Sequence, residues 1–331
     1  MNVVVLAGGL SPERDVSLAS GMLISNALVE KGHSVLLLDL YKGIEDDEMH
    51  LLFSNEKRNY DFTIDEEIPE LTKKNTKNLI GRNVIKICKM ADIVFLALHG
   101  SIGENGKLQA IFDCMGIKYT GSSYEGSILA MDKILTKKIL EHDNIKTPKW
   151  HLLKNVRKDN IKFPVVVKPA NNGSSIGVSI ANNLEEFEVA IIECEKYKDE
   201  IIIEEYIKGR EFSVGILDKT ALPPIEIIPK SGFYDYKNKY QEGKTIEICP
   251  PKISQDKIKE MQQIAMKVHN ALLLGAYSRI DFILDENGNL NVLEANSLPG
   301  MTKTSLLPQE ALVTGITYED LCEKILLSNL K

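Results

Sequence analysis

The chain has 331 residues, with 40 basic and 47 acidic side chains and a formal net charge of −7, which disfavours non-specific binding to nucleic acid or to acidic membranes. The longest apolar runs are strand-sized, too short to span a bilayer, and Met1 enters one of them without a basic segment. Five scattered cysteines fit reduced thiols better than disulfides or a zinc site. We therefore expect a cytoplasmic protein, and the length suggests two or three domains.

The first third of the chain alternates between predicted strands and helices. Apolar runs at 2–9, 33–40 and 91–100 are typical of buried strands, and helices are predicted over 17–32 and 104–116. This alternation predicts a parallel sheet with helices on its faces, in a Rossmann-like α/β domain at residues 1–121. Residues 54–83 are polar and carry no chemical motif that we can assign.

Two α+β modules are predicted to follow, at 122–207 and 208–331. One continuous helix is expected over 127–144, and strands over 163–169 and 200–207 flank another helix. Beyond residue 208 the pattern is largely antiparallel, with a mobile loop predicted at 231–244. A helix over 255–274 carries one apolar stripe, formed by Ile258, Met261, Ala265, Val268 and Leu272.

A hairpin near the C-terminus carries charged residues on one predicted face. Asn287-Gly288 is the preferred centre of a two-residue type I′ turn. Arg279 then faces Asn296 and Asp281 faces Glu294; a four-residue loop gives the same pairing. Because side chains alternate along a strand, the other face carries the core residues Ile280, Phe282, Leu284, Leu293 and Ala295.

Opposed carboxylates repel one another, so the charged face needs an explanation. The usual one is a solvated polar face, with Arg279 offsetting the acidic charge. The alternative is a magnesium site, because Mg²⁺ takes oxygen ligands from one or two carboxylates and substrate phosphates. The hairpin alone leaves both interpretations open, and the second requires phosphate ligands elsewhere.

Lys168 ends a predicted strand and precedes the Gly/Ser-rich stretch NNGSSIGVS. Glycines let a backbone approach a ligand closely, successive N–H groups can bind an anion, and a lysine adds a point charge for phosphate. An ordinary turn with an exposed lysine would give the same pattern. The GKT at 243–245 lacks the features of a P-loop, and AGGLSPERDVS lacks the GxGxxG spacing of a dinucleotide loop, so the case for NAD is weak.

These segments occur together, in this order, in one known family. Over nearly its whole length the chain resembles the D-alanine–D-alanine ligases of the ATP-grasp superfamily, through GGLSPERDVSLASG, ALHGSIGENGKLQ, YTGSSYEGSILAMDK, FPVVVKPANNGSSIGVS, GFYDYKNKY and RIDFILDENGNLNVLEANSLPGMTKTSLLP. The resemblance implies that ATP phosphorylates the carboxylate of one D-alanine and that the amine of a second attacks the acyl phosphate. The product would be D-alanyl-D-alanine for peptidoglycan precursors, made by a homodimer.

The resemblance also implies roles for individual residues. Asp281, Glu294 and Asn296 would bind two Mg²⁺ or Mn²⁺ ions. Arg279 and the backbone N–H of Gly300 would stabilise the tetrahedral oxyanion. Glu13, with His99 nearby, would hold the first D-alanine, Ser305 the second carboxylate, and Ser174 with Tyr240 would fasten the mobile loop. The residues that would contact ATP are Lys133, Lys168, Ser174, Glu204, Glu205, Tyr206, Ile207, Glu211 and Lys239.

Taken singly, these residues have ordinary structural alternatives. Glu13 could cap a helix, His99 could be a satisfied histidine at a strand end, Ser305 could be a turn residue, and the loop tyrosines could be packing residues. Their joint occurrence favours function for Glu13, Lys168, Arg279, Asp281, Glu294 and Asn296. The chain departs from the family pattern at Asn105, at Glu205 and at the Asn pair 171–172.

Other functions fit the same segments less well. Ligases that join D-alanine to D-lactate differ in the mobile loop, where Tyr240 favours an amine nucleophile, and a D-serine ligase is a further alternative. Other ATP-grasp ligases would take other amino acids. A nucleotide-binding protein without catalysis would have no need of the metal ligands together with Arg279.

Overall fold

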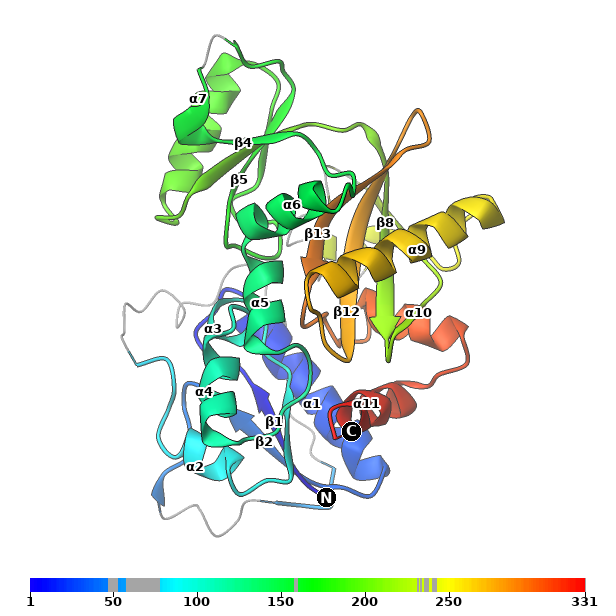
Figure 1. Ribbon diagram of the computed structural model, residues 1–331. Coiled ribbons are helices and arrows are strands. Elements are labelled where there is room, and N and C mark those ends of the chain that lie inside the picture. The colour runs from blue at the N-terminus through cyan, green and yellow to red at the C-terminus, as the bar shows by residue number, and fades with distance from the viewer. Residues whose placement is uncertain are drawn as a thin grey trace.

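The computed structural model describes residues 1–46, 53–57, 78–157, 160–230, 232, 234, 238–239 and 243–330. Three β-sheets organise these residues, one parallel and two antiparallel, with helices packed on their faces (Figure 1). Most of the predicted insertion at 54–83 and of the predicted loop at 231–244 lies outside the described residues. In the described part of the chain, no helix is long and apolar enough to cross a membrane.

The N-terminal sheet is parallel, as predicted, with the order β2-β1-β3. Its strands are β1 (Asn2–Ala7), β2 (Ser34–Asp39) and β3 (Ile93–Leu96), and the helices of this region are α1 (Arg14–Glu30), α2 (Val84–Cys88), α3 (Ser101–Glu104) and α4 (Lys107–Met115). The C-terminal helix α11 (Tyr318–Ser328) packs beside α1, and its Leu321 and Ile325 belong to the core of this sheet. The two ends of the chain therefore share one core.

The central sheet has the order β4-β7-β5-β6 and is antiparallel. Its strands are β4 (Trp150–Leu152), β5 (Val165–Pro169), β6 (Ser179–Ala181) and β7 (Ile201–Glu205), with the short 3-10 helix η3 (Leu153–Asn155) after β4. Helix α7 (Leu184–Glu195) covers one face and buries Phe187 and Ala190 against Val165 and Val167. This packing holds β5, and hence Lys168 near its end, in place.

Two helices, α5 (Tyr124–Met131) and α6 (Lys133–His142), replace the single helix predicted over 127–144. The break falls at Asp132, whose backbone is extended and whose carboxylate accepts hydrogen bonds from the N–H groups of Ile134 and Leu135, at 2.8 and 3.1 Å. An aspartate in this position caps the start of a new helix. The prediction was wrong because the apolar spacing continues across the cap.

The large sheet is antiparallel, with strands in the order β11-β10-β8-β12-β13 and with β9 paired to β8. Its strands are β8 (Gly209–Leu217), β9 (Thr220–Ala221), β10 (Ile225–Pro229), β11 (Thr245–Ile248), β12 (Tyr277–Asp285) and β13 (Leu290–Asn296). Helix α9 (Gln255–Ala271) covers one face, and all five residues of its predicted stripe are buried. Helix α10 (Leu306–Val313) packs against β8.

The β12–β13 hairpin has the predicted pairing at the charged residues but a different turn. Arg279 faces Asn296 and Asp281 faces Glu294. The turn holds three residues rather than two or four, because Asp285 N–H donates to Asn289 O at 2.9 Å. Gly288 lies within this turn at φ +79°, which favours glycine.

Leu293 is not the core residue that we predicted. The register shifts between Asp281 and Phe282, so Phe282 faces Val292 and Leu293 is an extra residue, as in a β-bulge. Val292 and Ala295 are buried in the core, whereas Leu293 lines a cavity on the other side of the sheet. The limits 1–121, 122–207 and 208–331 stay predictions.

Candidate active site

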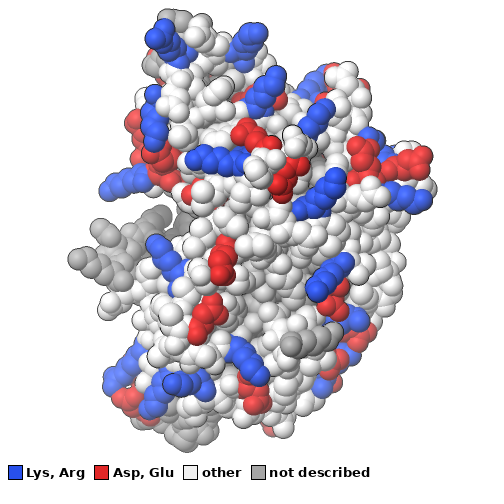
Figure 2. Space-filling view, in the orientation of Figure 1, with Lys and Arg blue, Asp and Glu red and all other residues white. Residues whose placement is uncertain are grey.

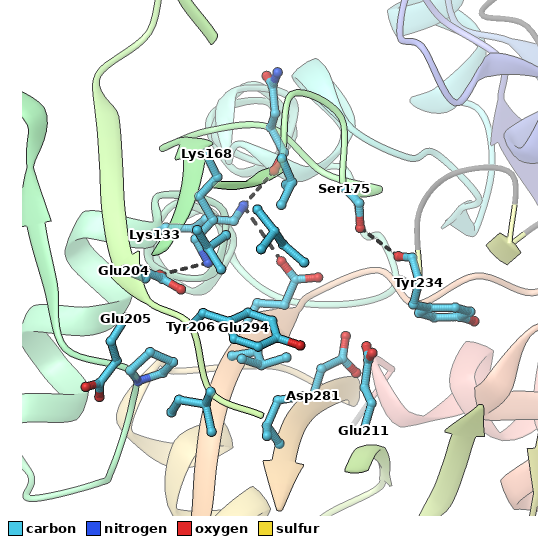
Figure 3. A pocket seen from close by; sticks show the side chains of 18 of the residues that line it. Lys133, Lys168, Ser175, Glu204, Glu205, Tyr206, Glu211, Tyr234, Asp281 and Glu294 are labelled. Atoms are coloured by element: carbon cyan, nitrogen blue, oxygen red, sulfur yellow. Dashed lines mark hydrogen bonds and ion pairs between the residues drawn. The ribbon is translucent and has the colours of Figure 1, made fainter. Parts of the chain in front are cut away.

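A cavity of about 160 Å³ lies between the central and the large sheet (Figure 3). Part of its wall is apolar, formed by Val166, Val178, Ile180, Ile283 and Leu293. All but one of the residues predicted to contact ATP also line it: Lys133, Lys168, Glu204, Glu205, Tyr206, Ile207, Glu211 and Lys239. The exception, Ser174, lines a neighbouring pocket. The fold thus gathers side chains from seven elements (α6, β5, β6, β7, β8, β12 and β13) and the intervening loops around one space.

Two buried lysines enter this cavity. Lys133, the first residue of α6, donates from Nζ to the carbonyl of Asn172 at 2.6 Å and lies 3.8 Å from Glu294 Oε2. Burial lowers the pKa of Lys133, while Glu294 opposes this effect. Lys168 lies 2.8 Å from Glu204 Oε1. Two ammonium groups in one cavity suit a ligand with several negative charges.

The two glutamates at the end of β7 point in different directions (Figure 3). The Glu204 carboxylate is buried and points to Lys168. Burial alone would raise the pKa of Glu204, but Lys168 and Lys137 outweigh burial and lower it. Glu205 is exposed, and its carboxylate accepts a hydrogen bond from Lys149 N–H at 3.0 Å. The Glu204 carboxylate is therefore paired with lysines, and residues 205–207 line the cavity beside it.

The charged face of the hairpin turns into this cavity and is not a solvated face. Asp281 is 6% exposed, and its carboxylate accepts hydrogen bonds from Arg279 Nε and Nη2, at 2.9 and 2.8 Å, and from Ser213 Oγ at 2.7 Å. Asn296 Nδ2 adds a bond at 3.2 Å. Burial alone would lower the pKa of Arg279, but the adjacent Asp281 carboxylate outweighs burial and raises this pKa above its ordinary value.

The oxygen atoms of this face form a donor set that suits magnesium. Asp281 and Glu294, opposed on adjacent strands, provide two carboxylates, and Asn296 provides an amide oxygen. An oxygen-only set of this kind fits Mg²⁺. No group of three or more His, Cys, Asp or Glu side chains that could hold a metal is found among the described residues, so the remaining ligands would have to come from substrate and water.

A second pocket, of about 50 Å³, adjoins the first, and Tyr234 and Lys239 line both. The second pocket brings together every described residue for which we predicted a role in catalysis or D-alanine binding: Glu13, His99, Ser174, Arg279, Gly300 and Ser305. Asn296 lines it as well. Tyr240 lies outside the described residues.

Glu13 reaches this pocket from the start of α1. It occupies the N-cap position, but its side chain does not cap the helix, and its carboxylate instead accepts a hydrogen bond from Ser174 Oγ. His99 is buried nearby, and its Nε2 has no hydrogen-bond partner among the described residues. Burial lowers the pKa of His99, while Glu13 opposes this effect. Neither residue fits the purely structural alternative.

The Gly/Ser loop after β5 joins the two pockets. Ser174 and Ser175 both have positive φ, at 50° and 58°, an unusual conformation for residues other than glycine. The first contacts Glu13, and Ser175 Oγ donates to the carbonyl of Tyr234 at 2.9 Å (Figure 3). The loop therefore contacts both the N-terminal domain and the C-terminal module.

Ser305 is both a turn residue and a pocket residue. It precedes α10 without capping it, and its hydroxyl accepts a hydrogen bond from Thr302 N–H at 2.9 Å. A Cβ atom on Gly300 would lie 2.8 Å from Ser305 Oγ, so a side chain at position 300 would push into this turn.

Two acids were missed by the sequence analysis, the partly buried Glu104 and the fully buried Glu310. Glu104 lines the second pocket and accepts from Gly100 N–H; burial, followed by the charge of Glu13, raises its pKa to about 8. Glu310 lies behind β8 and accepts from Gly215 N–H at 3.0 Å, and burial raises its pKa to about 8. Glu104 stands next to the unusual Asn105, which was the only signal at that position. Glu310 lies within an ordinary helical pattern.

Comparison with known proteins shows which family this chain is similar to. Family models described as D-ala D-ala ligase N-terminus and C-terminus match residues 2–122 and 134–327. A D-alanine–D-alanine ligase of Pediococcus pentosaceus is 45% identical, over 100% of this chain and 98% of its own. Crystal structures of the D-alanine–D-alanine ligase from Bacillus anthracis, alone and complexed with ATP, match with TM-scores of 0.80 and 0.77 at 31% and 30% identity, covering 100% of this chain and 97% of theirs.

The three sheets and the cavity between two of them define an ATP-grasp enzyme, as predicted. Its N-terminal and C-terminal parts both match the same ligase. The chain belongs to the D-alanine–D-alanine ligase family.

Proposed function

We propose that this protein joins two molecules of D-alanine to D-alanyl-D-alanine at the expense of ATP, for peptidoglycan precursors. The observation that carries the proposal is the contact between two pockets of different character. One is partly apolar and holds two lysines; the other is small and polar, and Arg279 lines it next to Asp281 of the first. A nucleotide in the first would present its terminal phosphate to an amino acid in the second.

The first pocket would bind ATP. The apolar wall, with Leu293 and Ile283, would hold the base, while Lys133 and Lys168 would neutralise phosphate charge. When bound at Asp281, Glu294 and Asn296, Mg²⁺ or Mn²⁺, two ions by family resemblance, would offset the charge of the transferring phosphoryl group. Asp281 would have to share its carboxylate between that site and Arg279, to which it is already bonded.

The second pocket would bind the amino acids. Glu13 would hold the ammonium group of the first D-alanine, whose carboxylate takes the γ-phosphoryl group of ATP to give an acyl phosphate and ADP. The amine of the second D-alanine, held by its carboxylate at Ser305, then attacks the acyl carbon, and phosphate leaves. Arg279 and the N–H of Gly300 would stabilise the oxyanion of the tetrahedral intermediate. The hydrogen bond from Ser174 to Glu13 would hold the Gly/Ser loop over the site, and this loop would help to exclude water.

The test is product analysis with ATP, Mg²⁺ and equal concentrations of D-alanine, D-lactate and D-serine. We expect D-alanyl-D-alanine as the main product, with ADP and phosphate released in equal amounts. Comparable or faster formation of the D-lactate or D-serine product would overturn the assignment. Turnover with L-amino acids but not with D-alanine would indicate another ATP-grasp ligase, and nucleotide binding without turnover would indicate a non-catalytic protein.

The setting of this activity is part of the same proposal. Free ATP as a substrate fits the cytoplasm, and the family resemblance supports a homodimer. Acidic and basic side chains are interspersed on the face shown in Figure 2, a pattern that does not favour a nucleic acid or an anionic membrane as partner.

A further inference from the structure

A buried lysine behind the first cavity contacts the residues that line it. Lys137, on α6, is 1% exposed and is not among the cavity-lining residues. Its Nζ lies 2.8 Å from Glu204 Oε1 and donates to Thr147 Oγ1 at 2.7 Å. Burial lowers the pKa of Lys137 to about 8, while Glu204 opposes this effect. A lysine so deeply buried requires such partners.

The contacts of Lys137 connect two parts of the site. On one side, Thr147 Oγ1 donates to the carbonyl of Val292 at 2.9 Å, two residues before Glu294 on β13. On the other side, the Glu204 oxygen that Lys137 contacts also lies 2.8 Å from Lys168 Nζ (Figure 3 shows this second contact). A continuous series of polar contacts thus runs from the metal-binding hairpin to the phosphate-binding lysine.

We propose that Lys137 is a positioning residue for ATP, which holds and neutralises Glu204 so that the charge of Lys168 remains available to the phosphates. This inference rests on the proposed function, in which Lys168 contacts ATP. Lys137 itself does not touch the nucleotide and acts through Glu204.

The balance of charge supports this role. Glu204 and Lys168 alone would form a neutral pair, and a buried carboxylate with one partner attracts that partner strongly. Lys168 would then have to leave Glu204 to reach a phosphate. With Lys137 present, the cluster has two ammonium groups and one carboxylate, so one positive charge is in excess. Lys168 can turn toward a phosphate while Glu204 keeps Lys137 as its partner.

The test is a double-mutant cycle on ATP affinity, with Lys137→Met, Glu204→Gln and the double variant. In the native background we expect Lys137→Met to weaken ATP binding about tenfold, the loss of roughly one hydrogen bond to a charged group. The KM for D-alanine should stay unchanged. In the Glu204→Gln background, where no carboxylate is left to neutralise, the same substitution should change ATP affinity less than about twofold. Lys138→Met, at the exposed neighbouring position, is the matched control.

If Lys137→Met folds, two outcomes would overturn the proposal. One is an unchanged ATP affinity in Lys137→Met; the other is an equal loss in both backgrounds, as expected for a lysine that only supports the fold. If Lys137→Met does not fold, the double variant decides, because it should fold and bind ATP like Glu204→Gln; a double variant that also fails to fold refutes the proposal. A failure of the proposed function is distinguishable, because the unmodified protein would then bind no ATP or make no dipeptide.

Discussion

Glu294→Gln separates the role of this residue in the reaction from its role in the fold. The Glu294 carboxylate lies 3.8 Å from Lys133 Nζ, and its side chain is 25% exposed. At that separation, and with an effective dielectric constant of about 20, the two charges attract by about 4 kcal/mol. Partial exposure screens this attraction, and Lys133 keeps its hydrogen bond to Asn172, so the net loss of stability should be about 1–2 kcal/mol.

The same substitution should have a far larger effect on the reaction. A glutamine provides one neutral oxygen where the proposed site needs a carboxylate, so we expect phosphate release to fall about 10²–10³-fold or more. The assay is phosphate release at saturating ATP and D-alanine, with a Mg²⁺ titration and a thermal melt of the same sample. The apparent Mg²⁺ requirement should rise, while the melting temperature drops by only a few degrees.

Glu286→Gln, in the turn of the same hairpin, is the matched control. This side chain is exposed and paired with Lys208 at 2.9 Å, and it lines neither of the two pockets. It should retain full activity. Near-normal turnover in Glu294→Gln, or an equal loss in both variants, would contradict the metal-binding role.

Four further substitutions test separate parts of the site and of the packing behind it. Glu13→Gln should raise the KM for the first D-alanine about 10–100-fold and leave ATP affinity unchanged; a matching loss of ATP affinity would contradict its assignment. Leu293→Ala should weaken ATP binding with little loss of stability, whereas Val292→Ala in the core should do the reverse. The raised pKa of Glu310 means that the folded chain loses stability as pH rises from about 4.5 to 8, by up to about 5 kcal/mol. Glu310→Gln should remove that loss in melts between pH 5 and 9, and parallel pH profiles would refute the argument.

The hairpin shows how a sequence can predict the pairing of charged residues correctly although the predicted turn length is wrong. We predicted a two-residue turn, and the structure has three residues there, which shifts the register by one. The bulge at Leu293 shifts it back before Asp281 and Glu294 meet. The Asn-Gly signal fixes where the chain reverses but not the loop length. The bulge depends on tertiary contacts, since Val292 N–H donates to Lys146 O from outside the hairpin.

Sequence patterns predicted the individual helices and strands better than the contacts between them. The parallel sheet, the stripe on α9 and the grouping of site residues follow from periodicity and family motifs, both of which are local in the sequence. The break at Asp132 was missed because an aspartate in an apolar helical pattern is also compatible with an uninterrupted helix.

The pairing of Lys137 with Glu204 shows where sequence reasoning reaches its limit. Lys137 occupies a helical position where a lysine is ordinarily exposed, and its neighbour Lys138 is indeed exposed. What distinguishes the two is that α6 packs with Lys137 turned inward, where its Nζ contacts Glu204 on β7 and Thr147 in the segment before β4. Burying an ammonium group is costly unless its partners are already in place, so the assignment depends on the arrangement of three segments. Only the folded chain therefore distinguishes the buried Lys137, for which we propose a role in ATP binding, from the exposed Lys138.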